Sequence, residues 1–324
     1  MRMVMGCMLL LLILQPASAQ TQRNSLENAF SKYRVSATAC ARIEHYSGSV
    51  IYIPENAFDL MEHYVDSVDI YYRELRSPID MVIHKIPMTY NVLGRQVHLE
   101  SSGMFEIYAR VGADNIGISE DRSIEVRFAI PPEQRQSQTE GYRLDTGQNQ
   151  WTSYSSNIGL NGIDENDDDL WGSSPVQNEV MMEDEDGVLF TTADSIRQVV
   201  FQSMEIFDFG LYNYDRIIRG ETYIPIMASF VDDQGKAFES SVFVVYEGLN
   251  SVFEYWPGDW AEKFSILDKR SYKLFTIDEE GKVYTLSEFP SLSDVNGKNH
   301  TFRLKARGDA PKDKPSLIAL TGVE

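Results

Sequence analysis

Between Gly48 and Phe128 the chain contains the segments GSVIYIP (Gly48–Pro54), VDIYYRE (Val68–Glu74) and GMFEIYAR (Gly103–Arg110). In the second segment, Val68, Ile70 and Tyr72 would point to one face, and the residues between them to the other. A strict period of two over this many residues indicates strands with one buried face. The sequence therefore predicts half-buried antiparallel strands and an all-β fold.

The N-terminal residues are typical of a signal peptide. Arg2 precedes the apolar run MLLLLIL (Met8–Leu14), and the small residues ASA (Ala17–Ala19) follow it. The run is too short to span a bilayer, and small residues at this place form a cleavage site. We expect a mature chain that begins at Gln20, has no membrane span, and is exported to the periplasm or the outer membrane.

The chain has two cysteines. Cys7 lies before the apolar run, whereas a lipid-attachment cysteine follows such a run, so we expect no lipid anchor. Removal of the signal peptide would leave Cys40 alone, and a lone thiol cannot form an internal disulfide.

Length limits the number of hydrophobic cores, and charge limits the kinds of binding partner that the protein can have. The 324 residues are 43% apolar, which is enough to form two hydrophobic cores. The 49 acidic and 29 basic residues give a formal net charge of -20, which repels phosphate backbones and anionic lipids. Cations, basic proteins and neutral sugars remain possible partners. Together with the predicted export, this predicts an envelope protein or a glycan as the partner, and no nucleic acid.

The chain is predicted to form two β-sandwich domains of the immunoglobulin-like or ZU5-like kind, joined by an acidic linker. Prolines at 131 and 132 end the first set of strands, and short apolar runs with Asp/Gly turns resume from Tyr223. The predicted divisions are a signal peptide at 1–19, an N-terminal segment at 20–40, a first sandwich at 41–151, an acidic linker or long loop at 152–187, a second sandwich at 188–307 and a frayed tail at 308–324.

Two segments have an ambiguous or isolated pattern. Leu26, Phe30 and Tyr33 have helical spacing, which predicts a short helix over Ser25–Tyr33. The segment Asp194–Phe207 fits a helical stripe, but its β-branched and aromatic content favours a strand, and we predict a strand.

The chain resembles a family of uncharacterised exported envelope proteins of Bacteroidota, closely over most of Gly48–Trp151 and more loosely over Phe207–Arg307. The resemblance lies in GSVIYIPENAF (Gly48–Phe58), VDIYYRE (Val68–Glu74), IPMTY (Ile86–Tyr90) and LESSGMFEI (Leu99–Ile107), and more loosely in FGLYNYDR (Phe209–Arg216). The opening of this region, from Gly48, is also similar to ZU5-type β-sandwich modules. Because such modules are protein-interaction domains, the resemblance implies binding, and it assigns no catalytic residue.

The densest aromatic cluster is EYWPGDW, residues 254–260. Tyr255, Trp256, Asp259 and Trp260 could bind a sugar, since rings stack on it and carboxylates bind its hydroxyls; Trp is also a frequent anchor at binding surfaces. The alternative is that these rings fill the core or pack the turn.

One acidic segment has the ligand spacing of a calcium site. Asp164, Asn166 and Asp168 stand at i, i+2 and i+4, but position six of the loop is Asp169 and position twelve is Pro175, so this is no EF-hand. The segment is either a weak calcium site or a solvated acidic linker, and the sequence points to no other cofactor.

Other polar residues offer weaker patterns. The histidines lack zinc spacing, although His84 and His98 flank one connection and could meet. Glu74, Glu100 and Glu106 lie on predicted strands near arginines, and two of them could form the carboxylate pair of a glycosidase; a solvated sheet face gives the same pattern.

These patterns predict a non-catalytic binding or scaffolding protein of the bacterial cell envelope. One alternative is a carbohydrate-binding or adhesin-like protein that uses the Trp256/Trp260 loop. The other alternative is a hydrolase with strand-borne carboxylates.

Overall fold

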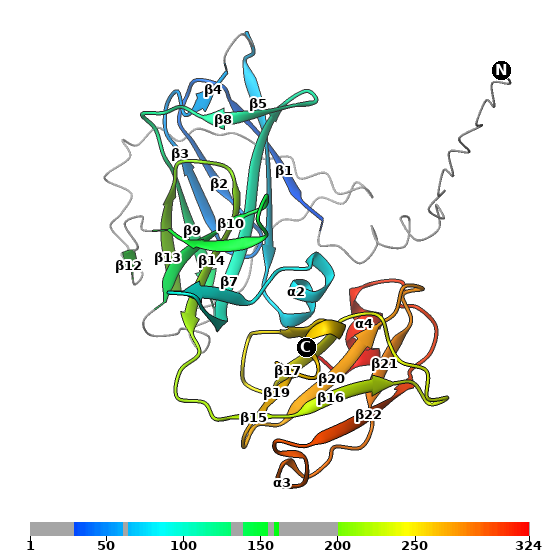
Figure 1. Ribbon diagram of the computed structural model, residues 1–324. Helices are drawn as coiled ribbons and strands as arrows, with labels where there is room; N and C mark the ends of the chain where they lie inside the picture. Colours follow the sequence, from blue (N-terminus) through cyan, green and yellow to red (C-terminus); the bar gives the residue numbers. More distant parts are fainter. Residues whose placement is uncertain (1–28, 61–63, 131–138, 155–158, 162–199, 324) are drawn as a thin grey trace, which may run out of the picture.

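The computed structural model describes residues 29–60, 64–130, 139–154, 159–161 and 200–323, and this part is all-β, as predicted (Figure 1). It has an N-terminal part, residues 29–217, and a C-terminal part, residues 223–323, which lie one above the other in Figure 1. None of the helices found in these residues is long and apolar enough to cross a membrane. The predicted signal peptide lies outside the described residues.

Two sheets form the N-terminal part. The larger sheet has the order β1-β5-β7-β14-β10-β11 with β4, β6 and β8 attached, and the smaller has the order β12-β13-β9-β3-β2. Their strands are β1 (Ser31–Ser36), β2 (Ala41–Glu44), β3 (Val50–Ile53), β4 (Phe58–Asp59), β5 (Ser67–Leu75), β6 (Thr89–Val92), β7 (Arg95–Val111), β8 (Asp114–Ile118), β9 (Ile124–Ile130), β10 (Glu140–Asp145), β11 (Gln150–Ser153), β12 (Gly159–Asn161), β13 (Val200–Ile206) and β14 (Gly210–Ile217).

The predicted alternation along β5 is confirmed, because Val68, Ile70 and Tyr72 are buried. They join a core that contains residues of both sheets, such as Phe105 of β7 and Val126 of β9. The alternating sequence thus gives each sheet one apolar face, and the two apolar faces form this core.

The C-terminal part contains a six-stranded sheet of order β16-β22-β21-β20-β17-β18 and the strand pair β15-β19. Its elements are β15 (Tyr223–Pro225), β16 (Met227–Val231), β17 (Val242–Tyr246), β18 (Phe253–Tyr255), the 3-10 helix η3 (Pro257–Asp259), β19 (Ser265–Leu267), β20 (Tyr272–Ile277), β21 (Val283–Leu286), α3 (Leu292–Val295), β22 (Asn299–Ala306) and α4 (Lys314–Thr321). Strands β16 and β22 are parallel, and a second core lies on this sheet.

The chain does not divide where the sequence pattern suggested. Strand β13 pairs with β9 from Val200 to Ile206, and β14 pairs with both β7 and β10, so residues 200–217 belong to the N-terminal part. The sequence pattern predicts that they belong to a domain spanning 188–307, because a local pattern does not reveal a strand's distant partners. Within the predicted linker, 152–187, Thr152 and Ser153 end β11, and Gly159–Asn161 forms β12, which pairs with β13; the acidic residues of the linker lie outside the described residues.

Two local predictions were wrong. Ser31–Tyr33 begins strand β1, which pairs with β5, instead of ending a helix; residues 25–28 lie outside the described part. The tail contains helix α4, whose N-cap Asp313 accepts a hydrogen bond from the backbone N–H of Ser316. The predicted strand within 194–207 is confirmed over β13.

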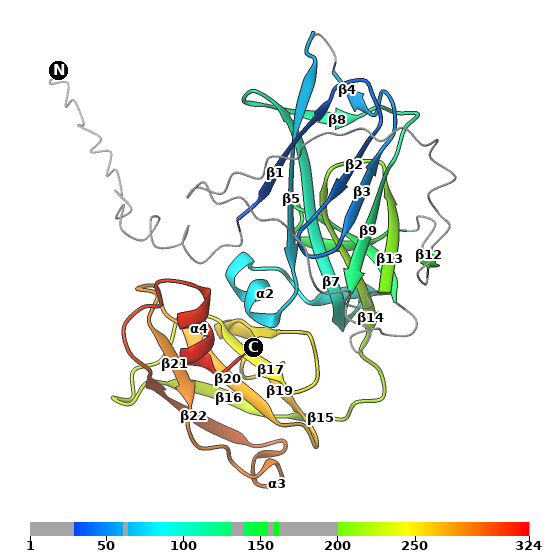
Figure 2. The same cartoon turned by 180° about the vertical axis from the view of Figure 1, so that it is seen from behind.

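A third core joins the two parts. Leu75, Ile79 and Met104 of the N-terminal part pack with Val252, Phe275 and Leu317 of the C-terminal part. Helix α2 (Pro78–His84) lies beside α4 at this junction, which Figure 2 shows from behind. A side chain of the C-terminal part, Ser251, also donates a hydrogen bond to the carbonyl of Leu99 on β7.

Candidate functional site

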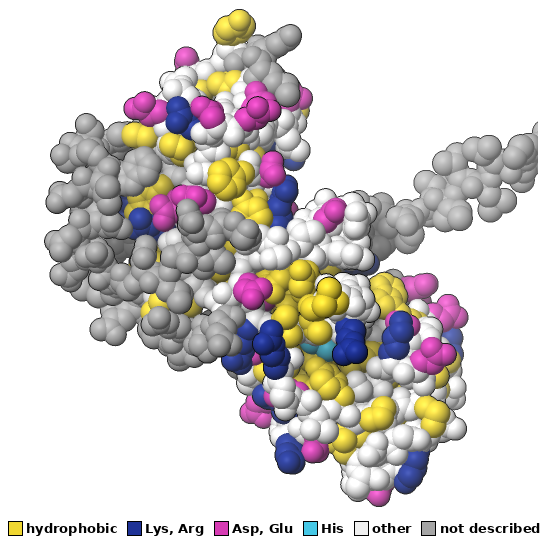
Figure 3. All heavy atoms as spheres, turned by 60° about the vertical axis from the view of Figure 1, so that its left-hand side comes forward, with side chains coloured by type: hydrophobic (Ala, Val, Ile, Leu, Met, Phe, Trp, Pro, Cys, Tyr) yellow, Lys and Arg dark blue, Asp and Glu magenta, His cyan; other side chains and the backbone are white. Residues whose placement is uncertain are grey.

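A cleft of about 1150 Å³ opens at the junction of the two parts. One wall consists of the end of α2, the β6–β7 hairpin and the β10–β11 turn, and the other of β17, β18, η3 and the β20–β21 turn. On the face seen in Figure 3, hydrophobic side chains gather where the two parts meet, with Lys or Arg side chains and a histidine beside them. The cleft is larger than a drug-sized pocket of about 300 to 1,000 Å³, so it has room for an extended ligand.

Three of the four predicted binding residues line this cleft, and the Pro257–Gly258 turn separates the two tryptophans. Trp256 is 60% exposed, whereas Tyr255 and Trp260 are each only 6% exposed. The Trp260 indole donates to the carbonyl of Tyr255 (2.9 Å) and its ring packs on Phe230. Trp260 is therefore a core residue and does not line the cleft, and Trp256 is the ring that a ligand can reach.

Polar bonds hold the same loop in place. The Tyr255 hydroxyl donates to the carbonyl of Ser265 (2.9 Å), and Lys263 forms an ion pair with Asp259 (2.8 Å). The 3-10 turn begins at Pro257, whose fixed φ suits that position. Trp256 thus projects from a fixed backbone.

The charges at the cleft are mostly negative. Two lysines, Lys85 and Lys263, line it together with the carboxylates of Glu239, Glu254, Asp259, Asp278, Glu279 and Glu280. Burial raises the pKa of Glu254, against the opposing effects of a hydrogen bond to Ser241 and the charge of Lys85. A cleft with this excess of acids repels anionic ligands.

The histidine in the cleft is neutral. His98 stacks on Phe253 with ring centroids 3.9 Å apart. Burial lowers the pKa of His98 to about 4, so the ring carries no charge at neutral pH.

The opposite wall carries uncharged amides that the sequence analysis missed. They come from two turns far apart in the sequence: Asn91, Gln96, Gln148, Asn149 and Gln150. Behind them, the indole of Trp151 donates to the carbonyl of Pro87 and so ties β11 to the segment before β6. The only sequence signal was polar residues at turns, which nearly every protein has.

No protein-family model matches this chain, and a search of curated proteins gave no significant match either. The site is therefore interpreted from its own geometry.

The predicted strand carboxylates are each paired with an arginine. Glu74 contacts Arg76, Glu100 contacts Arg216, and Glu106 contacts Arg73, all at 2.6 Å. None of these three glutamates is among the described residues that line the cleft. Of the two histidines that could have met, His98 lines the cleft, and His84 lies in the last turn of α2 and is not among the lining residues.

The calcium ligands proposed from the sequence, Asp164, Asn166 and Asp168, lie outside the described residues. Within the described residues, no group of three or more His, Cys, Asp or Glu side chains could hold a metal ion. Cys40 is exposed and free.

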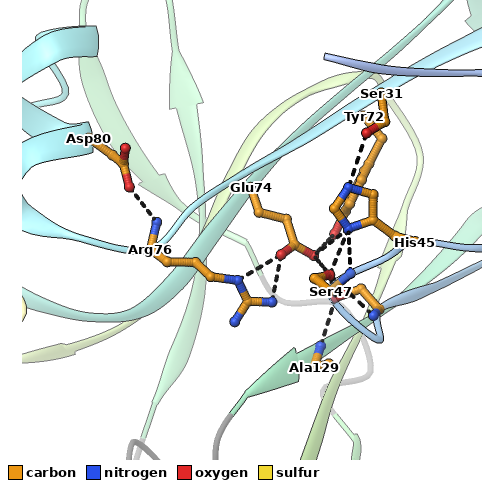
Figure 4. Close-up of polar contacts among 9 residues, drawn as sticks. Ser31, His45, Ser47, Tyr72, Glu74, Arg76, Asp80 and Ala129 are labelled. Atoms are coloured by element: carbon orange, nitrogen blue, oxygen red, sulfur yellow. Dashed lines mark hydrogen bonds and ion pairs between the residues drawn. The ribbon is translucent and has the colours of Figure 1, made fainter. Parts of the chain in front are cut away.

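A second polar cluster, drawn in Figure 4, lies where β1, the β2–β3 turn and β5 meet, and the side chains of His45 and Glu74 in it are buried. Ser47 donates its hydroxyl proton to Glu74 (2.8 Å), and its oxygen also lies 2.6 Å from Nδ1 of His45. His45 Nε2 lies 3.3 Å from the Ser31 hydroxyl, and Arg76 neutralises Glu74. These contacts connect β1, the β2–β3 turn and β5.

Serine, histidine and a carboxylate are the residue types of a serine hydrolase. Here the side chains of His45 and Glu74 are only 1% and 5% exposed, and burial lowers the pKa of His45 to about 4. His45 is thus closed off from solvent, and we assign the cluster to holding the β2–β3 hairpin against β5.

Proposed function

We propose that this is an exported, non-catalytic binding protein of the bacterial cell envelope and that the cleft is its binding site. The signal-peptide pattern and the resemblance to exported envelope proteins support the location. The size of the cleft and its position between two parts of the chain support binding, since ligand sites occur preferentially at such junctions.

Exposure of Trp256 carries this proposal. Its ring is 60% exposed, while the aromatic residues around it are buried and hydrogen-bonded. Trp256 also lines the cleft, and tryptophan is enriched among the residues that dominate binding energy. The loop provides rigidity, so little conformational entropy is lost when a ligand binds.

Catalysis has less support at the described carboxylates. Glu74, Glu100 and Glu106 are neutralised by arginines, which suits structural ion pairs rather than an acid and a base. Glu254 is the carboxyl that a hydrolase would use as its acid, because burial raises its pKa and it lines the cleft.

Trp256→Ala tests the proposal. We expect the variant to keep the melting temperature of the wild type within a few degrees, because the ring is exposed, and to lose at least tenfold in affinity for any ligand of the cleft. Binding would be measured by calorimetry against a panel of neutral glycans, anionic glycans and peptides. Tyr64→Ala is the control, since Tyr64 is fully exposed and does not line the cleft. Binding that is equal in wild type and Trp256→Ala for every ligand, or no binding at all, would overturn the proposal.

A further inference from the structure

We infer that the cleft takes a neutral oligosaccharide chain, which stacks on Trp256 and extends along the amide wall. This inference rests on the proposed binding function and names the chemical class of the ligand.

The first step is the shape and chemistry around Trp256. The flat indole offers an apolar surface, while Glu254 and Asp259 line the same cleft. A sugar ring combines an apolar face of C–H groups with hydroxyls at its rim. The apolar face of the sugar can stack on the indole, and the carboxylates can accept hydrogen bonds from the sugar hydroxyls.

The second step is the amide wall. A hydroxyl both donates and accepts hydrogen bonds, and an amide side chain does the same. Asn91 uses its carbonyl oxygen to accept from the backbone N–H of Gly94 (2.8 Å), which leaves its NH₂ group to donate. Gln96 uses its NH₂ group to donate to Thr89 (2.9 Å), which leaves its carbonyl to accept. The β6–β7 hairpin pairs Asn91 with Gln96, so a donor and an acceptor stand side by side.

The third step is charge. Six carboxylates line the cleft against two lysines, and Lys263 is already paired with Asp259. Uronic, sulfated or phosphorylated chains would therefore be repelled. A basic peptide would be attracted by the charge, but the opposite wall offers amides, which carry no charge to pair with its cations. Hydroxyls fit both walls.

The experiment titrates the full-length protein with neutral hexasaccharides of glucose, mannose, xylose and N-acetylglucosamine, with an oligouronide, and with oligolysine. We expect at least one neutral hexasaccharide to bind, with affinity reduced at least tenfold by Trp256→Ala and severalfold by Gln148→Ala. Tyr64→Ala should bind like the wild type, and all variants should keep their melting temperature. Gln148 is exposed, so its loss tests the amide wall without disturbing the core.

The outcomes separate the two proposals. Binding of oligolysine or the oligouronide that depends on Trp256, with no neutral sugar bound, would overturn the sugar class and leave the cleft as a binding site. Binding that no substitution in the cleft changes would overturn both. Release of new reducing ends that Glu254→Gln abolishes would replace sugar binding by hydrolysis of the same ligand class.

Discussion

Gly103 occupies a position in β7 that no other residue fits. Its φ is +141°, and a Cβ atom there would lie 2.3 Å from the ring of Phe128 in the facing sheet. We expect Gly103→Ala to destabilise the protein by about 3 kcal/mol, because backbone strain and overpacking add. Gly112→Ala is the matched control, since its φ is +60° but nothing lies within 4 Å of the added atom; about 1 kcal/mol is expected there. Urea unfolding measures both, and equal losses would show that contact with Phe128 is unimportant.

Asp215 gives the stability a pH dependence. Its carboxyl is fully buried on β14, accepts from the Asn213 amide, and has one oxygen without a hydrogen-bond partner, and burial raises its pKa well above the usual value. The unfolded carboxyl ionises near pH 4 while the folded one stays protonated, so this group destabilises the fold progressively as pH rises above about 4. Asp215→Asn mimics the protonated form. We expect the variant to gain stability relative to the wild type between pH 4 and pH 8, and to lose that gain near pH 4, in thermal melts. An effect independent of pH would contradict this.

Helix α4 was missed by sequence reasoning, and its contacts explain why it forms. Eight residues that include Pro315 give too short a pattern to predict a helix, but the Asp313 cap and burial of Leu317 and Val323 at the junction stabilise it. Residues 31–33 lie in a segment with helical spacing but form the start of β1. Their backbone pairing with β5 outweighs the local preference for a helix. The half-buried strands, in contrast, were predictable, because alternation is encoded within each segment.

Lys314 connects α4 to α2. Its ammonium contacts Asp80 at 2.5 Å, and Asp80 is 1% exposed and also accepts from the backbone N–H groups of Arg76 and Ser77. Lys314→Met would leave this buried carboxylate without that cation. We expect a loss of about 1 to 2 kcal/mol, below the value for a fully buried pair because Lys314 is partly exposed, and faster hydrogen exchange in α4. Lys305→Met, at an exposed position on β22, should change neither quantity. An unchanged exchange rate in α4 of Lys314→Met would show that the pair does not hold the helix.

The cleft itself could be foreseen only in part from the sequence. Trp256 stood out because it lies in a dense local cluster, yet the amides that face the cleft come from turns some fifty residues apart and from the other part of the chain. Such a site depends on how the parts dock, and docking depends on the third core, whose members are spread from Leu75 to Val323. Local sequence patterns do not reveal those long-range contacts.

A cut within residues 162–199 distinguishes one folded assembly from two separable domains. The strands before the cut include β7, β9 and β10, and those after it include β13 and β14, which pair with them residue by residue. A site for a specific protease inserted after Pro175 should therefore yield two bands in denaturing gels but one peak at the original elution volume under native conditions. The two bands should separate only in denaturant, because backbone pairing and the shared core hold the pieces together. Two native peaks would instead mean that residues 200–217 belong with the C-terminal part, as the sequence pattern alone suggested.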